Sequence, residues 1–114
     1  MPQPPSPVWE DRWGAVATDA PHGIFGSAAN MRSKSSAEQT AMADCKAKGG
    51  INCIVENWYS NSCAVMVVGD GGYNVTARDT LVEATERGMR YCTDAKRTNC
   101  RVHFSTCSLP VQIR

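Results

Sequence analysis

The stretch "CKAKGGINC", from Cys45 to Cys53, returns later in the chain as "CTDAKRTNC", from Cys92 to Cys100. Both stretches have the same length, begin and end with cysteine, and place asparagine directly before the closing cysteine. The offset that aligns them also aligns Ala37 with Ala84. Because repeated spacing of this kind is typical of duplicated supersecondary units, we expect two copies of one unit, residues 12–60 and 62–108 of a single domain spanning 12–114.

Each copy has the residue pattern of a ββαβ unit. In the first copy, Ala37, Ala41 and Cys45 recur every four residues and so share one face of a helix, which Gly49 and Gly50 then end. Turn residues and branched residues before and after this helix predict a hairpin and a returning strand. The predicted strands are residues 13–18, 24–30, 51–59, 63–68, 73–77 and 99–107, and the predicted helices run from about 33–36 to 45 and from about 78 to 92.

These units predict an α+β fold, in which the strands form one mostly antiparallel sheet and both helices pack on one face of it. Ala41 and Gly88 occupy equivalent helix positions, and both are small. Glycine in mid-helix costs about 1 kcal/mol relative to alanine. We therefore expect each helix to lie close to the sheet at this position.

Six cysteines in 114 residues are typical of a protein from an oxidising compartment. A helix, a tight turn and a return strand bring Cys45 within reach of Cys53, and likewise Cys92 of Cys100. The two remaining cysteines, Cys63 and Cys107, then pair across the sheet by elimination. Chain-entropy reasoning assigns about 2.6 kcal/mol to each short loop and about 4 kcal/mol to the long one.

Zinc is the alternative use of these cysteines. Structural zinc sites favour closely spaced cysteine pairs or added histidines, whereas His22 and His103 neighbour no such pair. A redox C-x-x-C motif is also absent from the sequence. We therefore expect three disulfides, no metal and no cofactor.

The charges are balanced, with 12 Lys and Arg against 11 Asp and Glu. Such a balance supplies no field that would concentrate nucleic acid, so we expect no nucleic-acid partner. The longest apolar run, "CAVMVV" from residue 63 to 68, has the length of a strand and not of a membrane span. The proline-rich residues 1–11 are expected to form a disordered tether. They lack the pattern of a signal peptide, so we expect a mature, periplasmic or secreted chain.

Few residues suggest catalysis. His22, in a predicted turn, and His103, on a predicted strand, are the only side chains that ordinarily titrate near neutrality. Asp70 in "GDGG" fits a hairpin turn better than a phosphate or calcium loop. Glu83 and Glu86 are neighbours on a helix and fit a solvated face better than an acid–base pair. The protein is therefore predicted not to be an enzyme.

The segment between the two copies is the candidate partner-binding region. Aromatic side chains flanked by polar ones are common at protein interfaces, although Trp58 packing over a sheet edge explains the pattern equally well. No residue indicates an oligomeric state, but an exposed sheet edge can pair with a second copy. The candidate partner-binding residues are Asn57, Trp58, Tyr59, Ser60 and Asn61.

Several motifs resemble those of an uncharacterised family of small secreted bacterial proteins, known only as a domain of unknown function. They are "WGAVA" from residue 13, the A-x₃-A-x₃-C helix that ends at Cys45, and "NSCAVMVVGDGGY" from residue 61. The resemblance covers about residues 13–107 and implies export and disulfides, but no established activity or catalytic residues. The chain departs from the pattern at Asn74 and Thr76, where aromatic residues often stand.

We expect a non-enzymatic binding protein that works outside the cytoplasm. The narrowest form of this hypothesis is a periplasmic immunity protein that inhibits a secreted, cell-wall-degrading amidase toxin, because such a toxin acts in the same compartment. A rigid cross-linked domain would insert a loop or helix end into the enzyme. The alternatives are a secreted factor that acts on host cells and a small hydrolase with an unrecognised site.

Overall fold

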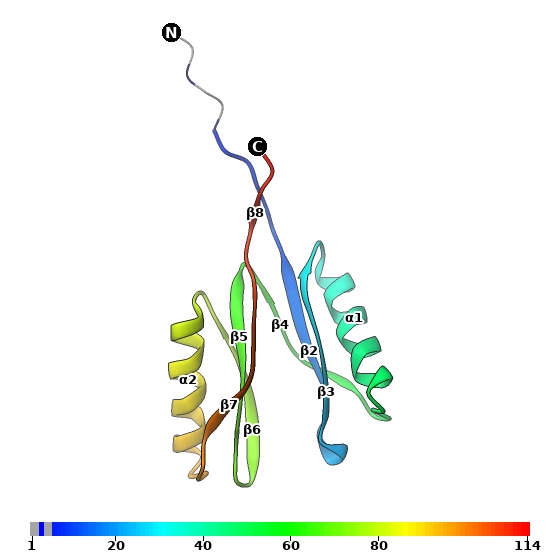
Figure 1. Cartoon of the computed structure of the whole chain (residues 1–114), viewed down its shortest axis with the longest axis vertical. Helices are drawn as coiled ribbons and strands as arrows, with labels where there is room; N and C mark the ends of the chain where they lie inside the picture. The colour runs from blue at the N-terminus through cyan, green and yellow to red at the C-terminus, as the bar shows by residue number, and fades with distance from the viewer. Residues whose placement is uncertain (1–2, 4–5) are drawn as a thin grey trace.

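The computed structural model describes residue 3 and residues 6–114, and within them the chain forms two successive ββαβ units (Figure 1). The predicted α+β class and the repeated element order are confirmed. A single 3₁₀ turn, η1 (Ala20–His22), joins the first two strands of the first unit. The first unit contains β2 (Trp13–Asp19), β3 (Ile24–Met31), α1 (Lys34–Ala47) and β4 (Ile54–Ser60), and the second contains β5 (Ser62–Gly69), β6 (Gly72–Arg78), α2 (Leu81–Asp94) and β7 (Arg101–Ser108).

Helix α1 begins after Ser33, whose hydroxyl accepts a hydrogen bond of 3.0 Å from the backbone of Ser36. This bond satisfies one of the free N–H groups at the helix start. The buried residues of α1 include Ala41 and Cys45. They lie so close to β3 that a Cβ atom at Gly26 would overlap the backbone of both. The small residues of this helix face therefore allow the close approach that the sequence predicted.

Helix α2 likewise has a hydroxyl residue as its N-cap and small residues on its buried face. Thr80 caps it by accepting a 3.1 Å bond from the backbone of Glu83, so the helix begins slightly later than predicted. Gly88 lies on the buried face, where an added Cβ would come 2.8 Å from Val67 and 3.1 Å from Val65. Both equivalent helix positions are thus close to a sheet.

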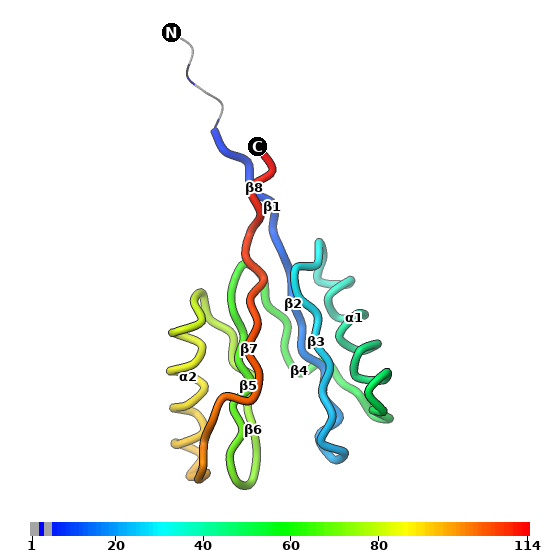
Figure 2. Tube along the Cα trace, in the orientation of Figure 1, coloured from blue at the N-terminus to red at the C-terminus, as the bar shows by residue number. Residues whose placement is uncertain are grey.

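The strands form two separate antiparallel three-stranded sheets, with orders β3-β2-β4 and β6-β5-β7. The prediction of one sheet with both helices on the same face is wrong. The two sheets face each other, and α1 and α2 cover their opposite outer sides, which gives four layers (Figures 1 and 2). β3 lies against β7 and β4 lies against β6. This arrangement is possible because the central strands β2 and β5 are buried on both faces.

All three predicted disulfides are confirmed: Cys45–Cys53, Cys92–Cys100 and Cys63–Cys107. The first two close equivalent loops of the two units, with Cα–Cα distances of 6.2 and 6.1 Å. The third joins directly opposite residues of β5 and β7, whose Cα atoms are 4.0 Å apart. Because the structure uses every cysteine in a disulfide, it excludes the alternative of a zinc site built from these sulfurs.

The two ends of the chain pair with each other in a short antiparallel ladder of β1 (Trp9–Glu10) and β8 (Val111–Gln112). The backbone of Val8 extends the ladder, donating a 3.0 Å bond to Arg114 and accepting a 2.8 Å bond from Ile113. The expectation of a disordered tether over residues 1–11 is therefore corrected for residues 8–10. Residues 1, 2, 4 and 5 of that tether lie outside the described residues.

Candidate functional site

A cleft of about 260 Å³ lies between the two sheets, and its lining includes Gly23 and Gly72 at the turns of the two hairpins. This volume is slightly below the range of about 300–1,000 Å³ that is usual for small-molecule pockets. It is large enough for one bulky side chain or a small ligand. The residues that line the cleft are mostly apolar: Thr18, Ala20, Gly23, Ile24, Phe25, Met66, Val68, Gly72, Tyr73 and His103.

Phe25 of β3 provides the main aromatic contact between the two sheets. Its ring centre lies 5.2 Å from that of Phe104 and 5.7 Å from that of His103, both on β7. The Phe25 and His103 rings are inclined by 70°, an edge-to-face arrangement that aromatic pairs prefer. The ammonium group of Lys48 lies 5.0 Å from the centre of the Phe25 ring. One wall of the cleft is therefore an aromatic cluster contributed by both units.

Thr18, Tyr73 and Glu56 form a hydrogen-bonded group that also joins the two units. The Thr18 and Tyr73 hydroxyls donate to the same carboxylate oxygen of Glu56, at 2.9 and 3.2 Å, and lie 3.3 Å from each other. Burial raises the pKa of Tyr73 above its ordinary value of 10.0, and the nearby Glu56 carboxylate acts in the same direction. Tyr73 is thus protonated at neutral pH and supplies a hydroxyl, not an anion, to the cleft.

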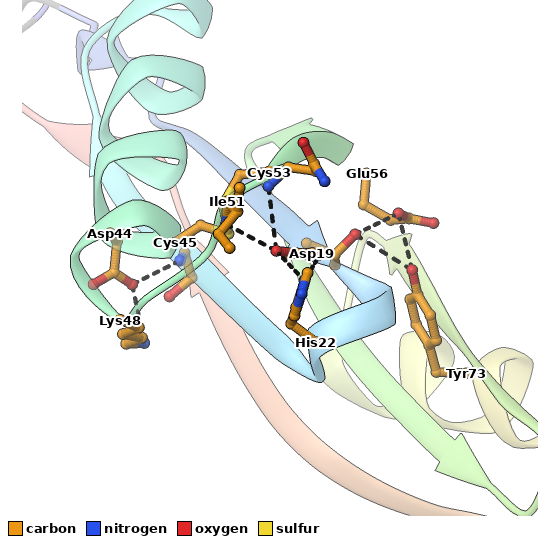
Figure 3. Close-up of a disulfide and its surroundings, with 12 residues drawn as sticks. Asp19, His22, Asp44, Cys45, Lys48, Ile51, Cys53, Glu56 and Tyr73 are labelled. Atoms are coloured by element: carbon orange, nitrogen blue, oxygen red, sulfur yellow. Dashed lines mark hydrogen bonds and ion pairs between the residues drawn. A yellow bond between two sulfur atoms is a disulfide. The ribbon is translucent and has the colours of Figure 1, made fainter.

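Asp19, at the end of β2, is fully buried and joins η1 to the loop that follows α1 (Figure 3). One of its oxygens accepts backbone bonds from Ile51 and Asn52 at 2.9 and 3.2 Å. The Nδ1 atom of His22 lies 2.8 Å from the same Asp19 oxygen. The bond from His22, followed by those from Ile51 and Asn52, lowers the pKa of Asp19 from 3.8 to about 2. At physiological pH the Asp19 carboxylate is therefore charged, and it is engaged in hydrogen bonds with His22, Ile51 and Asn52.

The structure brings both histidines to the same end of the molecule. His103 lines the cleft directly, and so do Ala20, the first residue of η1, and Gly23, which follows His22. The histidine–aspartate pair was not predicted from the sequence. The spacing of Asp19 and His22, three residues apart across a turn, is the signal that could have identified it.

The predicted partner-binding segment has mainly intramolecular contacts. Tyr59 is buried, the Asn57 amide donates 3.2 Å to the Val75 carbonyl, and the Ser60 hydroxyl donates 3.1 Å to the Arg12 carbonyl. Asn61 accepts a 3.0 Å bond from the backbone of Arg12. Trp58 is the one large exposed side chain of the five.

Trp58 lies at 45% exposure on the outer side of the first sheet. Its ring centre is 5.8 Å from that of Trp13, and the ammonium group of Lys34 lies 4.2 Å above it. A partner role for the segment stays a prediction, and Trp58 is the side chain that would carry it.

The other acidic residues considered from the sequence lie away from the cleft lining. Asp70 sits in the β5–β6 turn and accepts bonds of 2.8 Å from Thr98 and 2.6 Å from Asn99. Glu83 and Glu86 line a shallow hollow of about 110 Å³ on the side of α2, together with arginines.

Within the described part of the chain, no three His, Cys, Asp or Glu side chains are grouped to hold a metal ion. Neither described helix has the length and apolar character needed to cross a membrane.

Comparison with known proteins identifies a family but no activity. The family model described as "Domain of unknown function (DUF4189)" matches residues 13–107. No curated protein and no solved structure is significantly similar to the chain. The matched region begins at the first residue of β2 and ends at the last disulfide cysteine, so it contains both ββαβ units and all three bridges. The chain therefore belongs to the DUF4189 family, a family of domains of unknown function.

Proposed function

We propose that this protein is a non-enzymatic binding protein that acts outside the cytoplasm and holds an apolar side chain of a protein partner in the cleft. The observation that carries this proposal is the position of the cleft between two units, each braced by its own disulfide. Such bracing keeps the walls in place before the partner arrives, so binding loses little conformational freedom. The three disulfides support an oxidising compartment.

The lining supports a side chain as the occupant. Phe25, Met66 and Val68 offer aromatic, thioether and aliphatic surface, while Thr18 and Tyr73 add hydroxyls on one side. An apolar cleft with a few fixed polar groups is the usual form of a binding pocket in proteins. A partner would gain most from an aromatic or large aliphatic residue at the tip of a loop.

The narrower proposal is that the partner is a secreted cell-wall amidase and that this protein is a periplasmic immunity protein against it. The test is to search the genes beside that of this protein for a secreted cell-wall amidase and to titrate the oxidised protein into it, with release of peptidoglycan fragments as the readout. We expect complete inhibition at one equivalent. Full amidase activity in a tenfold molar excess of the protein would contradict the immunity role.

Two variants locate the binding site. Val68→Trp would fill the cleft, whereas Val102→Trp changes an exposed residue on the neighbouring strand that does not line it. We expect Val68→Trp to weaken binding at least about tenfold, the loss of 1.4 kcal/mol, and Val102→Trp to leave it unchanged. Circular dichroism checks that both variants fold. Equal binding by both would exclude the cleft as the site.

The Asp19–His22 pair favours a second candidate, a small hydrolase. A buried carboxylate that holds Nδ1 of a histidine leaves Nε2 available as a base, and the His22 side chain is 47% exposed. The described residues provide no nucleophile hydrogen-bonded to this ring. The test compares hydrolysis of p-nitrophenyl acetate by the wild type and by His22→Ala. Equal rates would remove His22 as a catalytic base.

A further inference from the structure

The ribbon formed by β1 and β8 projects beyond the two sheets, at the end of the molecule away from the hairpin turns (Figures 1 and 2). Large apolar side chains are exposed on both of its faces. Val111 is 41% and Ile113 is 53% exposed on one face, and Trp9, the partner of Gln112, is 57% exposed on the other. Leu109, just before the ribbon, is 51% exposed. Two-stranded ribbons are marginally stable in water by themselves. Exposed apolar clusters on a folded domain usually mark contact surfaces. The ribbon therefore has the properties of an interface.

The backbone of β8 has one edge open for pairing. The Ile113 N–H points to β1, where it donates 2.8 Å to the Val8 carbonyl. Because successive N–H groups of a strand point to opposite sides, the N–H of Gln112 points away from β1. The open edge of β8 is thus centred on Gln112, with Val111 and Ile113 on either side.

The outer edge of β1 is much less suited to pairing. Pro4, Pro5 and Pro7 precede it in the sequence and have no N–H to donate. β8 has one proline before it, Pro110, and the nearest charged residue is Arg114.

We propose that a second copy of this chain covers the ribbon, through antiparallel pairing of β8 with β8 about a two-fold axis at Gln112. The two Gln112 residues exchange their outward N–H and C=O groups. Val111 of each copy then lies opposite Ile113 of the other, so the same apolar pair forms twice. Pro110 and Arg114 lie outside β8 itself, and no like charges oppose each other at the axis. The pairing places apolar residues opposite apolar residues on both sides of the axis, as a two-fold interface requires, and on this ground we choose a second copy as the occupant.

The dimer joins the molecules at the ends opposite their clefts, because the ribbon and the hairpin turns lie at opposite ends of the molecule (Figure 1). Both clefts stay open and face away from each other. A dimer of this kind could hold two partner molecules at once or bind a partner that presents two copies of its loop. The dimer itself does not depend on the function proposed for the cleft.

The test is the mass of the 114-residue chain in solution, measured by multi-angle light scattering from micromolar to millimolar concentration. We expect a rise to twice the monomer mass of 12.4 kDa. We also expect the Gln112 amide to gain protection from hydrogen exchange over the same range. A mass of 12.4 kDa at every concentration would overturn the proposal.

Two variants and a control test the strand pairing itself. Gln112→Pro removes the outward N–H without touching a group that faces β1, and Val111→Lys with Ile113→Lys replaces the apolar pairs by like charges. Both are expected to remain monomeric under conditions in which the wild type doubles its mass. Ile51→Lys, at a 72% exposed apolar residue within the Cys45–Cys53 loop, is expected to dimerise normally. A dimer that persists in Gln112→Pro would show that another surface forms the contact and would overturn the β8 pairing.

Discussion

At the scale of single residues, Asp19 connects three parts of the first unit: the end of β2, the ring of His22 and the loop after α1. The sequence indicates a turn at this point, since proline and glycine follow Asp19 closely. It does not indicate the carboxylate's other partners, Ile51 and Asn52, because they lie far along the chain. Local pattern predicts the turn, and only the tertiary fold shows what the side chain binds.

Stability should fall in acid partly through Asp19. Its pKa is about 2 in the folded protein against an ordinary 3.8, so its contribution is complete above pH 3.8 and is lost as the pH falls towards 2. We expect the thermal midpoint of Asp19→Asn to depend less on pH between 4 and 2 than that of the wild type. The control is Asp79→Asn, in the exposed segment before α2. Equal pH dependence of Asp19→Asn and wild type would contradict this role.

Gly26 should be intolerant of any side chain. A Cβ atom there would overlap backbone atoms of Ala41 and Cys45, which cannot rotate away, so α1 must move from the sheet. We expect Gly26→Ala to lower the free energy of unfolding by about 1–3 kcal/mol, measured by guanidinium denaturation. Gly23→Ala is the comparison, because its Cβ would meet no atom within 4 Å and it strains only the left-handed backbone. A smaller loss for Gly26→Ala than for Gly23→Ala would refute the argument.

At the scale of elements, each helix is attached to its own next strand by a short disulfide loop. The repeated nine-residue pattern predicts this attachment because cysteine spacing, helix end and strand start are all local features. The cap of α2 is less visible: Thr80 lies after Arg78 and Asp79, and the sequence alone does not distinguish among these residues as the last one before the helix. Element order is thus predictable here, and single-residue boundaries are not.

The three disulfides should differ in their contribution to stability according to the loop each one closes. Their sequence separations are 8, 8 and 44 residues. Chain entropy then assigns about 2.6 kcal/mol to each short loop and about 4 kcal/mol to the long one. Replacing both cysteines of one bridge by alanine at a time, followed by guanidinium denaturation, measures this order. The prediction fails if loss of Cys63–Cys107 costs no more than loss of Cys92–Cys100.

At the scale of the whole molecule, the sequence correctly predicts two units but not how they meet. One sheet and two facing sheets bury nearly the same strand residues, so the apolar pattern within each unit fits both arrangements. The run "CAVMVV" does contain a hint, since uninterrupted apolar residues indicate a strand covered on both faces. The cleft depends on this arrangement, and for that reason it could not be located from the sequence.

Phe25 should contribute to the stability of the whole molecule, because its ring meets Phe104 and His103 across the gap between the sheets. Phe25→Ala removes these contacts and enlarges the cleft. Because Phe25 is only partly buried, we expect a loss of about 1–2 kcal/mol in the free energy of unfolding, less than at a fully buried position. Hydrogen exchange should show faster opening of both sheets. Val102→Ala, at an exposed residue of β7, is the control, and faster exchange in the first sheet alone would show that the two sheets open independently.

The order of the disulfides along the chain has a consequence for biogenesis. When the chain emerges N-terminus first into an oxidising compartment, Cys45 meets Cys53 before any other thiol has appeared, and the correct bond forms at once. Cys63 emerges next, yet its partner is the last cysteine, and it must remain reduced while Cys92 and Cys100 pass it. Pairing in order of arrival would join Cys63 to Cys92, so the second half of the molecule requires either delayed oxidation or an isomerase, while the first half requires neither.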